Sequence, residues 1–128
     1  FLAFWSSVLL LLSAFGGWRR MAQLYATDQA PTGKVASMVS GMVGWVSYRN
    51  VLKVSAEQTG LYLAVFGLFR PGHPPLLLPY YDIKSVERSQ GFWQPLLLIT
   101  VGRAETIARL RLPEKLFKDS PLAERLTR

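Results

Sequence analysis

"VLKVSAEQTGLYLAVFGLF" (residues 51–69) is the stretch that decides the fold, because two runs of strand-forming residues flank the turn signal "EQTG". In the first run, the apolar residues Leu52 and Val54 alternate with polar neighbours, which predicts a strand with one buried and one solvated face. The second run, "LYLAVF", is apolar at every position, which indicates a central strand or an outer face that something else covers. The stretch therefore predicts a hairpin within a β-rich domain.

Similar runs on both sides of this hairpin predict seven strands in all. Upstream, "VASMVSGMVGWVSY" (residues 35–48) is predicted to be one long strand that bends at Gly41 and Gly44. Downstream, prolines keep "RPGHPP" in a loop, and the short strand "LLL" ends at Pro79. The remaining strands are "IKSVERS" and the hairpin of "LLLITV" and "TIARLRL". We therefore expect a small mainly-β domain over residues 35–128, in which the final "PEKLFKDSPLAERLTR" forms a C-terminal helical tail.

The first eighteen residues, "FLAFWSSVLLLLSAFGGW", contain no charged side chain. As an α-helix this segment is about 27 Å long, close to the roughly 30 Å hydrocarbon core of a bilayer. We expect residues 1–27 to form a transmembrane helix with a juxtamembrane extension, and Trp5 and Trp18 to lie near the lipid headgroups. A buried core helix and a cleaved signal peptide are the alternatives, and the first is disfavoured because a domain of this size cannot cover so many apolar residues.

Positive charges next to this segment predict its orientation. Arg19 and Arg20 follow it directly, and Lys34 ends the linker "DQAPTGK" (residues 28–34). By the positive-inside tendency, the chain after the anchor is expected on the cytoplasmic side of a bacterial inner membrane. Because the chain begins with Phe1 rather than Met, we also expect residues to precede it.

Two short segments resemble bacterial pleckstrin-homology-like and GRAM-like domains. "GLYL" (residues 60–63) and "LPYYDI" (residues 78–83) match the "GLYL" and "IPxxDI" segments of these domains, and the resemblance covers roughly residues 35–118. It implies a seven-stranded pleckstrin-homology-like barrel followed by a C-terminal helix. It further implies structural roles for Gly60, Pro79 and Asp82. The chain is also similar to uncharacterised small proteobacterial membrane proteins that have one anchor and a "GHPPLL" loop.

Residue composition limits the chemistry that the chain can perform. Fifteen Lys and Arg against eight Asp and Glu give a net charge of +7, which favours an anionic partner. The basic residues are scattered singly along the predicted strands, so we expect no nucleic acid partner. The sequence has no cysteine and one histidine, His73, which stands in a proline-rich loop and is expected to form a local hydrogen bond. We expect no enzyme activity, no metal site and no cofactor.

The expected function is that of an accessory or structural subunit of a larger membrane protein complex, of respiratory, secretory or photosynthetic reaction-centre type. "LYLAVFGLF" and "GFWQPLLL" contain more apolar residues than a barrel of this length must bury. Phe66 and Phe69 in the first segment, and Phe92 and Trp93 in the second, are therefore predicted to contact a protein partner.

The alternative function is a membrane-surface sensor that binds anionic lipid headgroups. Pleckstrin-homology-like domains often bind such headgroups through basic residues near the first hairpin turn, and the resemblance places Arg49 and Lys53 there. Arg19 and Arg20 would add contacts to the bilayer beside the anchor.

Overall fold

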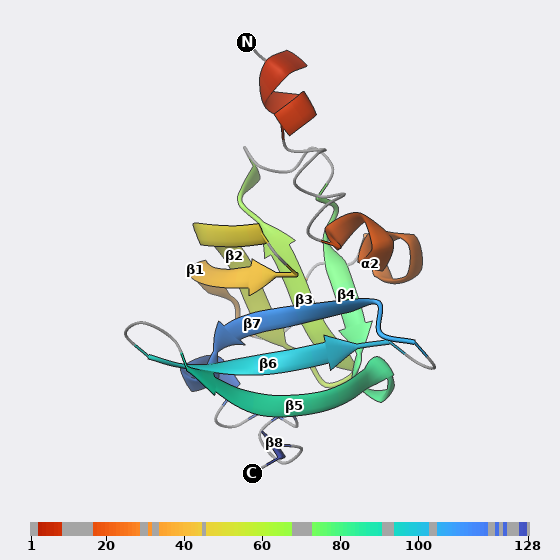
Figure 1. The fold of residues 1–128 in the computed structure, drawn as a ribbon. Coiled ribbons are helices and arrows are strands. Elements are labelled where there is room, and N and C mark those ends of the chain that lie inside the picture. Colours follow the sequence, from red (N-terminus) through yellow and green to blue (C-terminus); the bar gives the residue numbers. More distant parts are fainter. Residues whose placement is uncertain are drawn as a thin grey trace.

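The structure of the protein is a computed structural model. It describes residues 3–8, 17–28, 31, 34–44, 46–67, 73–90, 94–102, 105–117, 120, 122 and 126–127. These residues form a small mainly-β domain with one sheet in the strand order β4-β3-β2-β1-β7-β6-β5-β8 (Figure 1). The first seven of these strands pair antiparallel to their neighbours and curve into a nearly closed barrel, as the sequence predicts. The strands are β1 (Ala36–Val43), β2 (Val46–Ala56), β3 (Gly60–Val65), β4 (Leu76–Pro79), β5 (Ile83–Gln90), β6 (Pro95–Val101), β7 (Ala108–Pro113) and β8 (Leu126–Thr127).

The hairpin of β2 and β3 confirms the prediction made from residues 51–69. Its ladder runs from the pair of Ala56 and Leu61 to the pair of Leu52 and Val65. The N–H of Glu57 donates to the carbonyl of Gly60 at 2.9 Å and closes the turn. The inward side chains of the ladder are almost completely buried, so this hairpin supplies much of the core.

The prediction of one long strand over residues 35–48 is wrong. The structure has a hairpin turn after β1, and Val46 begins β2. Gly44 adopts a positive φ of 60°, which a tight turn requires, and its N–H donates to the carbonyl of Arg109 at 2.7 Å. Asn50, at φ 59°, lies inside β2 and not in a turn. The N–H of Asn50 donates to the hydroxyl of Ser40 at 2.9 Å, and this bond holds the irregularity in place.

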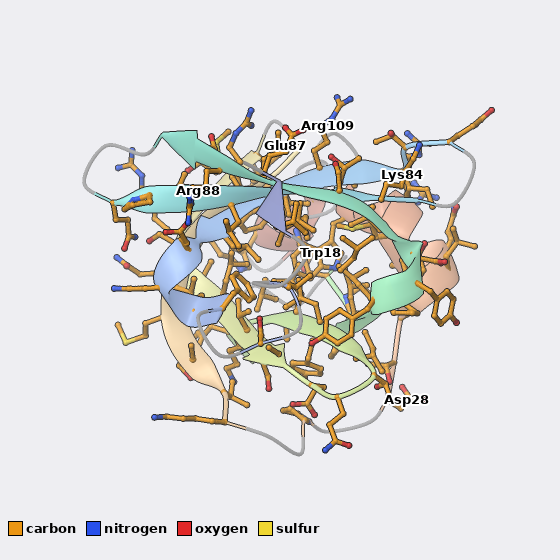
Figure 2. All side chains as sticks on the ribbon, turned by 90° about the horizontal axis from the view of Figure 1, so that it is seen from below. Trp18, Asp28, Lys84, Glu87, Arg88 and Arg109 are labelled. Carbon is orange, nitrogen blue, oxygen red and sulfur yellow. The ribbon has the colours of Figure 1, made fainter. Side chains whose placement is uncertain are left out.

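Helix α2 (Trp18–Tyr25) packs on the barrel, whereas the sequence predicted a continuation of the membrane anchor. Trp18, Met21 and Tyr25 recur at spacings of three and four and are buried, while Leu24 is 64% exposed. Figure 2 shows Trp18 in the middle of the molecule, and not at a surface where it could meet headgroups. Gly17 precedes the helix with a φ of 95°, a conformation that redirects the chain into α2.

Within the ranges described above, no helix is both long enough and apolar enough to cross a bilayer. Residues 9–16, which belong to the predicted span, lie outside those ranges. Residues 3–8 are helical and stand away from the barrel (Figure 1). Phe4 in this helix is 73% exposed, and none of residues 3–8 belongs to the core. The anchor was predicted over residues 1–27. It stays a prediction for the residues before Gly17, whereas Trp18–Tyr25 form α2 and pack on the barrel.

Among the described residues of the tail only Leu122 is α-helical, so the predicted C-terminal helix is not shown. A 3-10 turn, η3 (Glu114–Phe117), follows β7, and the Ser120 hydroxyl donates to the carbonyl of Phe117 at 2.9 Å. Leu126 and Thr127, expected to be helical, form β8, which pairs in parallel with Val86 and Glu87 at the edge of the sheet. Phe117 and Leu122 are buried in the core, while residues 118, 119, 121, 123–125 and 128 of the predicted tail lie outside the described residues.

Gly60 makes a close approach of β3 to β4 possible. It pairs with Pro79, and a Cβ atom at position 60 would overlap the carbonyl oxygen of Leu78. The prediction of a structural role for Gly60 and Pro79 is consistent with this contact. Gly67, by contrast, has open space where a Cβ would stand.

Gly60→Ala should lower the free energy of unfolding by about 1–3 kcal/mol, because the new methyl group forces the two backbones apart. Urea denaturation followed by tryptophan fluorescence measures the change. Gly67→Ala is the matched control and should stay within about 0.5 kcal/mol of the wild type. Equal free energies of unfolding for the two variants would contradict the close approach of β3 and β4 at Gly60.

Candidate functional site

The candidate site is the outer face of the β2–β3 hairpin. Side chains of a strand alternate between its two faces, and Leu52, Leu61 and Leu63 of the hairpin point into the core. The intervening residues therefore point outward. We call this set the β2–β3 outer face, and it consists of Arg49, Val51, Lys53, Tyr62, Ala64 and Phe66.

The middle of this face is apolar. Phe66 is 57% exposed, and its N–H donates to the carbonyl of Val51 at 2.8 Å, so the two residues are neighbours across the hairpin. Ala64 pairs with Lys53 and is only 5% exposed although it points outward, because larger side chains surround it. Tyr62 pairs with Leu77 of β4, which extends the apolar surface by one strand. Ser55, which pairs with Tyr62 on the same face, is only 2% exposed, so the most exposed apolar side chain of this face is Phe66 at its end.

Two cations lie on the same face. Lys53 lies between the buried Leu52 and Val54, so its side chain points away from the core. Arg49 follows the buried Tyr48 and also points away from the core, beside the register shift with β1. Arg49 is exposed and Lys53 is half-buried. In the part of the chain that the structure describes, neither cation has an ion-pair partner. Both charges are therefore available to an acidic partner.

Glu57 lies at the turn of the hairpin and is held by neighbouring groups. Its carboxylate accepts a hydrogen bond from the buried hydroxyl of Ser55 at 2.5 Å, and its carbonyl accepts one from the hydroxyl of Tyr80 at 2.5 Å. Burial, and then the charge of Glu57, raise the pKa of Tyr80. These bonds fix the turn and keep the end of the candidate face rigid.

The structure brings together three predicted site residues that the sequence assigned to different roles. Phe66 was predicted to bind a protein partner, and Arg49 and Lys53 to contact anionic groups. The resemblance places Arg49 and Lys53 at the first hairpin turn. In the structure that turn follows β1 at Gly44, and both residues are inside β2.

The other predicted contact residues do not belong to this face. Arg19 and Arg20 are exposed on α2. Phe69, Phe92 and Trp93 lie outside the residues that the structure describes.

Asp82 is buried, at 3% exposure, beneath α2. Its carboxylate accepts a hydrogen bond from the hydroxyl of Tyr25 at 2.8 Å, and its carbonyl accepts one from the N–H of Gly102 at 2.7 Å. The residue thus joins α2 to the turn that follows β6, which supports the structural role expected from the resemblance. No sequence pattern indicated this role of Tyr25, except that a tyrosine on the apolar side of a helix needs a partner for its hydroxyl.

A second buried polar cluster was missed from the sequence. His73 is 1% exposed, and its Nε2 lies 2.7 Å from the hydroxyl oxygen of Tyr48. The rings of His73, Tyr48 and Trp18 pack with centroids 5.1 to 5.8 Å apart. The indole N–H of Trp18 donates to the carbonyl of Pro74 at 3.0 Å. The bond between His73 and Tyr48 joins residues 25 positions apart, so it differs from the local hydrogen bond expected from the sequence. Together these contacts connect α2 to the proline loop.

The described residues contain no group of three or more His, Asp or Glu side chains that could hold a metal ion. Comparison of the chain with protein-family models, curated proteins and solved structures found no match. The resemblance to pleckstrin-homology-like domains therefore stays a prediction, and the argument for function depends on the geometry of the described surfaces.

Burial raises the pKa of Tyr48 well above its ordinary value, which makes stability depend on alkaline pH. The folded chain keeps a proton that the unfolded chain loses near pH 10, so this stabilisation is complete below about pH 10 and declines above it. The decline from one such group is about 1.4 kcal/mol per pH unit. Tyr48→Phe should remove that contribution to the slope between roughly pH 10 and 11, as measured by urea denaturation.

Tyr81→Phe is the control for this pH experiment, since it removes the hydroxyl of an exposed tyrosine. The comparison is made on slopes, because Tyr48→Phe also removes a buried hydrogen bond and lowers stability at every pH. Parallel curves for the wild type and Tyr48→Phe would contradict the burial of a neutral Tyr48.

Proposed function

We propose that this chain is a non-enzymatic, single-pass membrane protein that acts as an accessory or structural subunit of a larger membrane complex, and that it docks on a protein subunit through the β2–β3 outer face. The observation that carries the proposal is Phe66, a large aromatic side chain that is 57% exposed and lies beside Val51 and near two cations. Exposed aromatic side chains flanked by Arg are typical anchors of protein interfaces.

The chemistry of the face indicates the kind of partner. Tyr62, Val51 and Phe66 suit an apolar surface, while Arg49 and Lys53 suit carboxylates at its margin. The net charge of +7 adds a long-range attraction to an acidic partner. A membrane protein subunit with an apolar, acid-flanked segment is the partner that fits.

Membrane attachment is supported by the N-terminal segment. The eighteen residues that precede Arg19 contain no charge, and the exposed Phe4 is not covered by the barrel. A cytoplasmic position at a bacterial inner membrane follows from Arg19 and Arg20 by the positive-inside tendency.

A pleckstrin-homology-like barrel is the finer fold that we propose. Its support is the antiparallel order of β1 to β7 together with the "GLYL" and "LPYYDI" segments, which meet where Gly60 pairs with Pro79. The position of α2 in the core is a departure that the resemblance does not imply.

Binding of anionic lipid headgroups by the same face is the second candidate function. It is favoured by Arg49 and Lys53, which lie on one face with no ion-pair partner among the described residues. Flotation of the chain with anionic vesicles, compared with neutral ones, separates the two functions. Anionic lipid binding that Arg49→Glu with Lys53→Glu abolishes would favour the sensor.

Phe66→Ala should weaken partner association by about 2 kcal/mol or more, because it removes the exposed aromatic anchor. The measurement is the yield of a stoichiometric partner when the tagged full chain is purified from its membrane in mild detergent. Tyr81→Ala is the matched control, since Tyr81 is 76% exposed but follows β4 and lies outside the β2–β3 hairpin. Equal recovery of the partner with Phe66→Ala and Tyr81→Ala would contradict docking through this face.

A further inference from the structure

A second exposed apolar surface lies on another part of the barrel, between α2 and the 3-10 turn η2 (Tyr80–Asp82). Leu24 is 64% exposed and Tyr81 is 76% exposed, and both line one open hollow of about 560 Å³. Pro79 and Ile107 supply more apolar wall. These side chains come from distant parts of the sequence, so no sequence pattern could indicate their proximity. We call this surface the α2–η2 hollow.

The outer side of α2 continues this surface with a cation. Residues one turn apart on a helix share a side, so Arg20 lies beside Leu24 and opposite the buried Trp18 and Met21. Arg20 is exposed. Exposed Leu24, Tyr81 and Arg20 are the residue types that commonly contact the interfacial layer of a bilayer.

Two hydrogen bonds fix α2 to the barrel at both of its ends. Trp18 donates to the carbonyl of Pro74 at 3.0 Å, and Tyr25 donates to the carboxylate of Asp82 at 2.8 Å. The orientation of the outer side of α2 is therefore fixed relative to the barrel.

The position of α2 in the sequence brings it close to the bilayer. Its first residue, Trp18, is also the last residue of the uncharged N-terminal segment. Eight helical residues rise about 12 Å, so no part of α2 lies much farther than that from the end of this segment. The inner side of the helix is occupied by the barrel, which leaves the outer side to face the lipid.

We propose that the α2–η2 hollow rests on the membrane surface, with Leu24 and Tyr81 inserted among the headgroups and Arg20 directed at lipid phosphates. This inference rests on the proposed function only for the membrane tether. Glu105 is exposed at the rim of the hollow and opposes an anionic surface, while Asp82 is buried and bonded to Tyr25. Insertion of apolar side chains therefore contributes more than charge, and contact with neutral lipid is expected as well.

The absence of cysteine from the sequence permits a direct test with single-cysteine variants of the full chain. Leu24→Cys and Tyr81→Cys are labelled with an environment-sensitive fluorophore and reconstituted into phosphatidylcholine vesicles, with or without phosphatidylglycerol. Lipids brominated near the glycerol region quench a fluorophore that lies in the interface. Phe66→Cys is the matched control, because it labels an exposed apolar position of the β2–β3 outer face.

We expect quenching at positions 24 and 81 in both kinds of vesicle. At the control position 66 we expect little quenching. Arg20→Gln in the labelled chains should reduce the docked-to-undocked ratio about fivefold in anionic vesicles and leave neutral vesicles unaffected. Chains that float with the vesicles but show equally weak quenching at all three positions would overturn the contact and leave the tether intact. Chains that do not float with either vesicle would overturn the tether and this contact together.

Discussion

The indole N–H of the fully buried Trp18 donates to the carbonyl of Pro74, and this bond ties α2 to the segment that leads into β4. The indole ring fills the space beside Tyr48 and His73, whose own hydrogen bond is shielded from water as a result. Without the ring, two polar groups would face a cavity instead of a packed aromatic side chain. Helix α2 is thus part of the core and not an accessory to it.

The two edge strands of the barrel show why the chain needs its terminal segments. β4 and β5 are not paired with each other in the sheet order. After α2, Ala26 forms a bridge with Leu76, and the N–H of Thr27 donates to the carbonyl of Pro75 at 2.9 Å, so this segment covers the β4 edge. β8 covers part of the β5 edge. Covered edges protect a small sheet from pairing with other chains, which a docking domain must avoid.

Several elements could be predicted from the sequence because local signals agreed with the tertiary structure. The turn at Glu57–Gly60 is one, since a glycine stands between an alternating run and an apolar run, and β4 approaches this glycine closely. The exposure of Phe66 was predicted by counting apolar residues against the capacity of the barrel. Local pattern and tertiary packing reinforced each other at these positions.

The rest depended on contacts between residues far apart in the sequence. Gly41 and Gly44 are alike in sequence, and only the bond from Gly44 to Arg109 shows which one makes the turn. Trp18 is suited to a membrane interface and to a protein core, and the acceptor at Pro74 decides between them. Leu24 and Tyr81 become neighbours only in the folded chain, so the α2–η2 hollow had no signal in the sequence.

Native-state amide hydrogen exchange of the full chain tests most directly whether α2 belongs to the core. The N–H of Met21, which donates to the carbonyl of Gly17 at 3.1 Å, and the N–H of Ala26, which donates to Ala22 at 3.2 Å, report on the two ends of the helix. If the Trp18 and Tyr25 bonds hold α2 in the barrel, these amides should exchange only through global unfolding, with the same free energy as amides of the β2–β3 ladder. Exchange of the α2 amides at rates near those of an unstructured peptide, while the ladder stays protected, would contradict this account.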